Sequence, residues 1–120
     1  MADFRKLFVW QKARILIRFT YQVTSTFPSY EAFGLAGQMQ RAAVSIASNI
    51  AEGCGRDSGK DFSRFLKMAK GSLYELETQY YVAFDLQYIN DQTMIQAEQS
   101  CEEIGKMLTG ILRKLNTTSH

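Results

Sequence analysis

Apolar residues recur every three or four positions along almost the whole chain, and no segment alternates between apolar and polar residues with a period of two. This spacing is typical of amphipathic helices, because positions three and four apart lie on one helix face. The pattern predicts four helices, over about residues 9–26, 33–52, 58–86 and 91–115. With three short connections, they favour an all-α, up-down-up-down four-helix bundle in a single domain, residues 1–120.

Turn and cap residues predict where these helices begin and end. Pro28 ends the first helix, since proline cannot donate a backbone hydrogen bond and disfavours helical geometry before it. Gly53 and Gly55 end the second, where we expect a left-handed cap. Ser58, followed three positions later by Asp61, resembles a capping box and opens the third helix.

The last helix follows a turn at residues 88–91, which also supplies its N-cap. Its apolar row is the most regular in the chain and resembles a coiled-coil seam. It consists of Met94, Ala97, Cys101, Ile104, Leu108, Ile111 and Leu115. We expect the polar residues 116–120 after it to form a frayed tail.

The first and third helices carry more apolar surface than one bundle core needs. Large apolar patches are rarely left in water, and tyrosine suits a half-wet interface margin, so the surplus predicts a homo-oligomer. The alternative is that both helices are unusually well buried in one chain. The candidate interface residues are Trp10, Ile17, Tyr21, Tyr74, Tyr81 and Tyr88.

Two polar rows lie on otherwise apolar helices and have helical spacing. They consist of Gln38, Arg41, Ser45, Asn49 and Glu52 on the second helix and Ser72, Glu75 and Gln79 on the third. We call these eight residues the polar seam and expect the two rows to meet inside the fold through hydrogen bonds. We interpret the seam as a device that fixes helix register or subunit contact, and a polar ligand pocket is the alternative.

Arg41 and Glu75 are the charged pair of this seam. If the pair is buried, truncating one partner should cost about 3–5 kcal/mol, because the other charge is stranded.

Charge is unevenly distributed along a chain whose net charge is only +2. Residues 1–70 hold eleven basic and five acidic residues, residues 71–105 hold seven acidic residues and no basic one, and residues 106–120 hold three basic residues. Such separation can steer partners or dock one subunit onto another.

A basic row on the third helix is the candidate nucleic-acid site, because Lys and Arg side chains can neutralise phosphates. It consists of Lys60, Arg64 and Lys67, with Lys70 beside them and Arg56 in the preceding turn. Arg14 and Arg18 form a second patch on the first helix. Asp57 and Asp61 lie close by, and the pI near 8.6 is modest for a dedicated nucleic-acid binder. A solvated helix face is the alternative.

No residue pattern indicates catalysis, a metal or a cofactor. The sole histidine is His120, and Cys54 and Cys101 are isolated, so neither a metal-ligand set nor a nucleophile with a histidine base is expected. The glycine-rich segment 53–58 lacks the strand and the Gly-Lys-Ser/Thr ending of a phosphate loop. Without a signal peptide or a bilayer-length apolar run, we expect a cytoplasmic protein with no membrane contact and with reduced thiols.

Several short motifs follow one another in order along most of the chain. They are Phe27-Pro28, Glu31-x-x-Gly34-Leu35, Gln38-x-x-Arg41-Ala42-Ala43-x-Ser45-Ile46-x-x-Asn49-Ile50-Ala51-Glu52-Gly53, Gly55-Arg56-x-Ser58, Phe65-Leu66 and Ala69-x-Gly71-Ser72-x-x-Glu75-Leu76-Glu77-x-Gln79. Together they resemble the bacterial four-helix bundle proteins encoded in 23S ribosomal RNA intervening sequences. Two positions depart from the family pattern: Ala47 stands where proline is frequent, and Gln87 stands where a glycine commonly precedes the tyrosine.

The resemblance implies a homopentameric ring and no known enzymatic activity. Related bundles are accessory partners of a reverse transcriptase in diversity-generating retroelements, where a basic ring contacts nucleic acid. The sequence therefore favours a non-enzymatic oligomer that presents a basic surface to RNA, DNA or a nucleic-acid enzyme. A protein-interaction scaffold that does not bind nucleic acid is the alternative.

Overall fold

The computed structural model describes residues 3–118, which form four α-helices preceded and interrupted by short 3-10 turns. These elements are η1 (Phe4–Lys6), α1 (Phe8–Thr24), η2 (Ser29–Glu31), α2 (Leu35–Cys54), α3 (Gly59–Asp85) and α4 (Asp91–Thr118). The described residues contain no strand. The prediction of an all-α fold with four helices is confirmed.

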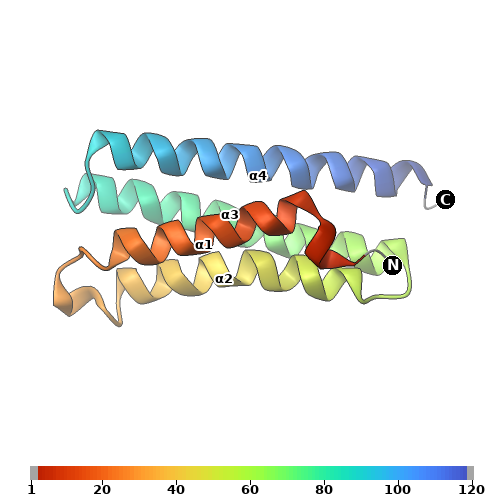
Figure 1. Cartoon of the computed structure of the whole chain (residues 1–120), viewed down its shortest axis with the longest axis horizontal. Coiled ribbons are helices and arrows are strands. Elements are labelled where there is room, and N and C mark those ends of the chain that lie inside the picture. The colour runs from red at the N-terminus through yellow and green to blue at the C-terminus, as the bar shows by residue number, and fades with distance from the viewer. Residues whose placement is uncertain (1–2, 119–120) are drawn as a thin grey trace.

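The helices run alternately up and down the long axis of a rod with extents of 48 × 23 × 20 Å (Figure 1). Each helix packs on the next one along the chain, and α1 also packs on α4, so the four close into a bundle. The connections α1–α2 and α3–α4 lie at one end. The α2–α3 turn lies at the other end, together with η1 and the C-terminus of α4.

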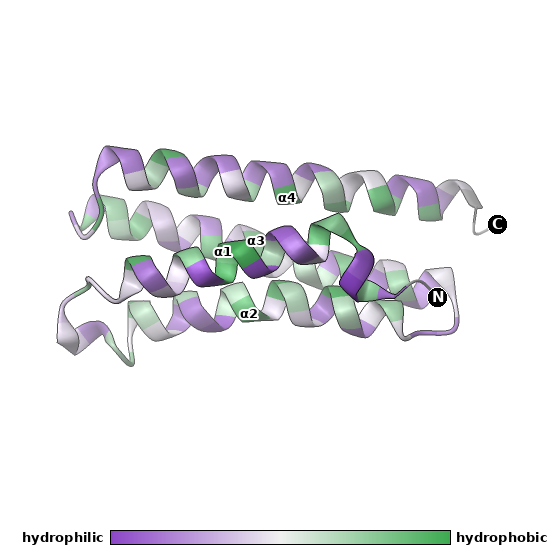
Figure 2. Ribbon diagram, in the orientation of Figure 1, coloured by the Kyte–Doolittle hydropathy of each residue, from purple (hydrophilic) through white to green (hydrophobic). Residues whose placement is uncertain are grey.

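The predicted apolar rows form one core. Hydrophobic and hydrophilic bands alternate along every helix (Figure 2). The core residues Leu16, Met39, Ile46, Leu66, Leu76 and Leu108 are almost completely buried. Tyr80 is also fully buried, and its hydroxyl is 2.8 Å from Thr20 Oγ1 on α1. Burial raises the pKa of Tyr80 well above its usual value, so this polar pair stays neutral inside the bundle.

Glycine plays a different role at the end of α2 from the one predicted. Gly53 lies inside the helix, Gly55 at the C-cap has a φ of −84°, and no described glycine has positive φ. The predicted left-handed glycine cap is therefore wrong. A Cβ added to Gly53 would lie 2.8 Å from Cδ1 of Phe62 and 2.9 Å from Cβ of Phe65, so this glycine allows α2 and α3 to approach closely.

The predicted N-caps of the last two helices are confirmed. Ser58 Oγ accepts a hydrogen bond from the backbone N–H of Asp61 (3.1 Å), and Asn90 Oδ1 accepts one from the N–H of Thr93 (2.9 Å). The predicted frayed tail is wrong for residues 116–118, which continue α4. His120 lies outside the described residues.

The turn between α3 and α4 contains the one described residue other than glycine with positive φ, Gln87 (φ 65°). Its N–H donates to the carbonyl of Phe84, and the N–H of Tyr88 donates to the carbonyl of Ala83. These two bonds define a Schellman cap, in which the residue after the C-cap adopts the left-handed conformation. Gln87 thus occupies a position that glycine fills most easily.

Candidate nucleic-acid interface

Charge is separated along the long axis of the bundle. The half that carries the α2–α3 turn comprises residues 3–16, 45–72 and 105–118, with twelve basic and four acidic residues. The opposite half, residues 17–44 and 73–104, has two basic and eight acidic residues. We call these halves the basic end and the acidic end. Their net charges of +8 and −6 give the molecule a strong electrostatic polarity.

The predicted basic row gathers at the basic end. Lys60, Arg64 and Lys67 project from one side of α3, are exposed, and line the same hollow of about 810 Å³. Asn116 near the end of α4 lines the same hollow, with Asp61, Ser63 and Met68. The three cations therefore act on one concave surface, which concentrates positive potential where a phosphate backbone would lie.

Arg64 of this surface and Arg56 beside it are both restrained by an aromatic ring. The guanidinium carbons of Arg56 and Arg64 lie 4.5 and 4.6 Å from the ring centroid of Phe65, which is only 5% exposed. Stacking on a buried ring restrains both side chains and leaves guanidinium N–H groups available as donors. Glu52 and Asp61 pair with them at 3.7 and 3.5 Å, but such exposed pairs are weak, so a phosphate can compete with them.

Lys70, predicted to lie beside this basic row, does not line the hollow and instead contacts α4. Its Nζ donates to Thr109 Oγ1 of α4 (2.9 Å) and lies 5.9 Å from the ring centroid of Tyr74, so it ties α3 to α4. Arg14 and Arg18 are exposed on α1, diagonally across the bundle from α3. The guanidinium of Arg14 lies 5.0 Å from the centroid of Trp10. The second basic patch is thus separate from Lys60, Arg64 and Lys67, which we call the ridge on α3.

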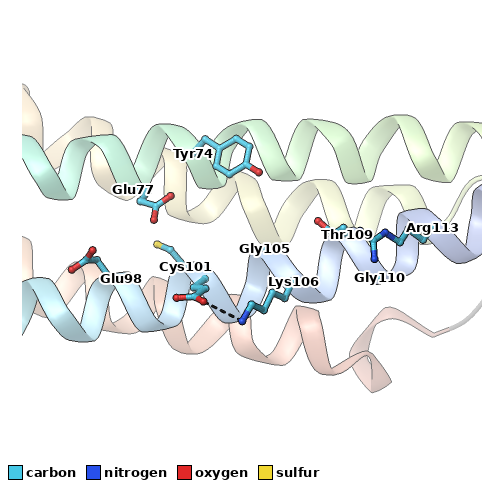
Figure 3. Close-up of a pocket in the computed structure, with 10 residues that line it drawn as sticks. Tyr74, Glu77, Glu98, Cys101, Gly105, Lys106, Thr109, Gly110 and Arg113 are labelled. Carbon is cyan, nitrogen blue, oxygen red and sulfur yellow. Dashed lines mark ion pairs between the residues drawn. The ribbon is translucent and has the colours of Figure 1, made fainter.

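Basic residues of α4 were missed by the sequence interpretation. Lys106 and Arg113 lie on the wall of a groove of about 650 Å³ between α3 and α4, opposite Tyr74 (Figure 3). Glu77, Glu98 and Glu102 line the same groove, so its charge is mixed. Lys106 pairs with Glu102 at 3.1 Å. The two cations are seven positions apart in the segment that has no acidic residue, and this spacing is the signal that could have found them.

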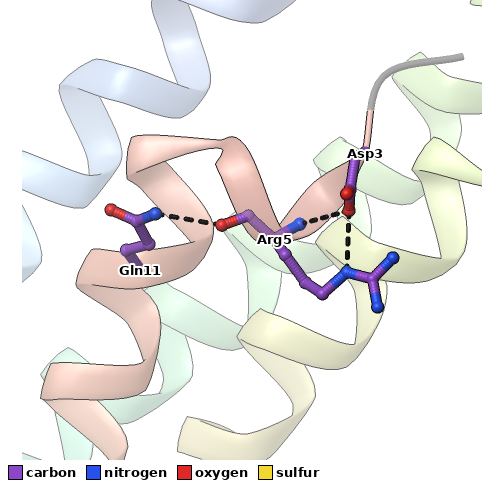
Figure 4. A network of polar contacts seen from close by, with 3 residues as sticks. All are labelled: Asp3, Arg5 and Gln11. Atoms are coloured by element: carbon purple, nitrogen blue, oxygen red, sulfur yellow. Dashed lines mark hydrogen bonds and ion pairs between the residues drawn. The ribbon is translucent and has the colours of Figure 1, made fainter.

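The short turn η1 is fixed at the same end by polar contacts (Figure 4). The carboxylate of Asp3 accepts from the backbone N–H of Arg5 (3.1 Å) and from its Nε (2.9 Å), and Gln11 Nε2 donates to the Arg5 carbonyl (2.9 Å). These bonds lower the pKa of Asp3 and raise that of Arg5. The charge of Arg5 is consequently directed at Asp3.

The polar seam forms in its central part. Asn49 Nδ2 donates to the carbonyl (2.9 Å) and Oγ (3.1 Å) of Ser45, and Ser72 Oγ donates to Ser45 Oγ (3.0 Å). This chain of bonds joins α2 to α3, as the spacing predicted. Gln79 is also buried, but its Oε1 has no partner among the described residues.

The outer members of the seam do not form the predicted buried pair. Arg41 and Glu75 are both exposed and, with Gln38, line an open hollow of about 350 Å³. The guanidinium of Arg41 lies back along α2, with Nη1 3.3 Å from where a Cβ on Gly37 would be. The cost of stranding a buried charge therefore does not apply in the single chain. Glu52 is exposed and pairs with Arg56 instead.

The candidate interface residues fall into two groups. Trp10 and Ile17 are partly buried against the core of their own chain, so the sequence overstated how much surface they leave free. Tyr88 is half-buried against Phe27. The other group remains open to solvent: Tyr21 is 46%, Tyr74 54% and Tyr81 44% exposed.

Three further features of the described residues concern metal ions, thiols and membranes. Within residues 3–118, no three His, Cys, Asp or Glu side chains gather closely enough to hold a metal ion. Cys54 and Cys101 are unpaired and buried, and burial raises the pKa of Cys101 to about 12, which disfavours a reactive thiolate. In the same part of the chain, no helix combines the length and hydrophobicity that crossing a bilayer requires.

The fold and the basic surface together define a four-helix bundle protein with one strongly cationic end. Residues 5–110 match the family model described as "23S rRNA-intervening sequence protein", and the chain belongs to this family.

A solved structure has the same fold: a protein of unknown function from the S23 ribosomal protein family of Bacteroides thetaiotaomicron. It is 23% identical, with a TM-score of 0.81 over 88% of this chain and 95% of that one. No curated protein matches the chain.

Proposed function

We propose that this protein is a non-enzymatic, oligomeric accessory or adaptor protein whose basic end binds the phosphate backbone of RNA or DNA. The observation that carries the proposal is the gathering of Lys60, Arg64 and Lys67 on one concave surface at the cationic end of the bundle. Arg56 and Arg64, stacked on Phe65, supply restrained donors beside it. Contacts with phosphates rather than base edges imply little sequence preference.

We further propose that the protein self-assembles, with a pentameric ring as the arrangement that the family resemblance implies. Tyr21, Tyr74 and Tyr81 support assembly because they are large, amphipathic and exposed. A ring would repeat the basic end around its rim, and a reverse transcriptase or another nucleic-acid enzyme is a suitable partner. The two unpaired, buried cysteines suit a reducing cytoplasm.

Fluorescence anisotropy of a labelled duplex of about 20 base pairs, titrated from about 50 to 300 mM KCl, tests nucleic-acid binding. The variant K60Q/R64Q/K67Q removes three cations, so the log–log salt slope should become less steep by about 2.7. The control is K12Q, which removes a cation that is paired with Glu103 at 3.1 Å outside the ridge.

K12Q should leave affinity and slope close to those of the parent protein. If the parent shows no salt-sensitive binding at low ionic strength, the proposal is wrong and the scaffold that does not bind nucleic acid replaces it. Equal losses in the two variants would also contradict it, because they would indicate a general charge effect in place of a defined surface.

A further inference from the structure

Large apolar side chains are displayed at the acidic end of the bundle, far from the basic surface. Phe33 is 98% exposed and Tyr30 is 77% exposed, both in the α1–α2 connection. Leu86, in the neighbouring α3–α4 connection, is 50% exposed. We call these three residues, two aromatic ones and a leucine, the aromatic tip. A phenylalanine in water is costly, and several exposed apolar side chains at one end of a molecule mark an interaction site more often than a single one does.

The connection that carries the tip is well fixed. Glu31 accepts from the backbone N–H of Leu35 through Oε1 (3.1 Å) and from the hydroxyl of Tyr88 through Oε2 (2.8 Å). The Tyr88 ring lies 5.1 Å from that of Phe27, and its hydroxyl is 3.4 Å from that of Tyr30. These contacts join both connections into one unit. Phe33 is therefore presented by a rigid support, which lowers the entropic cost of binding.

The electrostatic surroundings of the tip select the kind of partner. Residues 25–37 and 80–99 contain Glu31, Asp85, Asp91 and Glu98 and no Lys or Arg. The guanidinium of Arg41 reaches back along α2 to Gly37, so the local balance is four acidic residues against this one cation and stays negative. Nucleic acid and anionic lipid surfaces are repelled by such a field. A cationic partner is attracted, and the charge complementarity would steer its approach.

We propose that the aromatic tip docks a partner protein through a cationic segment, in which a Leu, Ile, Met or Phe packs against Phe33 and Tyr30 while flanking Lys or Arg side chains face the acidic rim. This surface lies at the opposite end of a 48 Å rod from the ridge on α3. The protein is thus able to hold a basic protein and a nucleic acid at the same time. The docking inference does not depend on nucleic-acid binding.

The test uses the full chain and a synthetic helical peptide of about 18 residues with a leucine stripe flanked by arginines. Its counterpart carries glutamate in place of arginine. The expected result is binding of the arginine peptide alone, with amide NMR shifts confined to residues 25–37 and 80–99. F33A should weaken binding about tenfold or more, as expected for a central apolar anchor.

The matched control is F8A, because Phe8 is also apolar and 72% exposed but lies at the basic end. F8A should leave the affinity within about twofold, since it lies outside the docking surface. Both side chains are in water, so neither variant should lower the unfolding temperature, which circular dichroism checks.

Peptide shifts elsewhere on the bundle, equal binding of the glutamate peptide, or equal losses in F33A and F8A would each overturn the docking inference. If F33A instead lowers the molar mass of the protein by light scattering, a second copy of this chain covers the tip. If a nucleic-acid duplex shifts the amides of the tip, nucleic acid occupies it. Both results contradict a basic protein partner.

Discussion

Gln87 is strained by its place in the α3–α4 turn. A side chain in the left-handed region costs about 1–2 kcal/mol, and glycine avoids that cost. Glycine also makes the unfolded chain more flexible, which offsets part of the gain. The family resemblance, in which glycine commonly stands here, agrees with the φ of 65°.

Q87G should therefore stabilise the protein by about 1 kcal/mol. Thermal unfolding followed by circular dichroism measures the change, which should raise the midpoint by about 3–5 °C for a domain of this size. Q87A is the control, because alanine retains a Cβ and its strain. A midpoint for Q87G at or below that of Q87A would show that the strain is absent.

At the scale of elements, the contact between α2 and α3 depends on a missing side chain. Gly53 has no room for a methyl group, since Phe62 and Phe65 lie within 3 Å of the added Cβ. Phe65 also supports the two stacked arginines. Pushing it outward would disturb the helix pair and the basic surface together.

G53A should destabilise the protein by about 1–3 kcal/mol through overpacking. G71A on α3 is the matched control, because a Cβ there meets nothing within 4 Å. Alanine also favours helix over glycine, so G71A should stabilise by about 0.5–1 kcal/mol. Urea unfolding distinguishes the two, and a neutral or stabilising G53A would contradict the close approach.

The helices themselves could be predicted from the sequence because each buries one apolar stripe, and burial imposes a period on the residues. Ser58 and Asn90 could be predicted as caps because their chemistry is local. The role of Gly53 could not, since a close approach depends on Phe62 and Phe65 of another helix. The exposure of Arg41 and Glu75 likewise depends on which faces of α2 and α3 pack together.

For the candidate site, sequence predicted the ridge on α3 because three cations share one helix face. It did not predict that Lys70 would donate to Thr109 of α4, or that Lys106 and Arg113 of α4 would line a groove beside α3. Both depend on which helix faces pack together. The sequence showed the separation of charge along the bundle only in part. The basic segments 3–16, 45–72 and 105–118 are separate in the sequence and come together at one end of the molecule because the helices are antiparallel.

At the scale of the whole molecule, this polarity constrains the proposed assembly. In a cyclic ring with the rods side by side, all copies point the same way, so a net charge of +8 lies beside +8 and −6 beside −6. Like ends then repel each other, and the contacts proposed for the exposed Tyr74 and Tyr81 would have to overcome that repulsion. In an antiparallel pair, opposite ends would attract each other.

Salt therefore discriminates between the two arrangements. Ions at about 0.5 M reduce the screening length to a few ångströms, so a parallel ring should associate more tightly than at about 0.05 M, and an antiparallel pair less tightly. Light scattering over a concentration series at the two salt levels measures the dissociation constant. We expect tighter association at high salt, and a short duplex added at low salt should have the same effect by neutralising the basic ends. Association that weakens with added salt would exclude the parallel ring and, with it, a continuous basic rim.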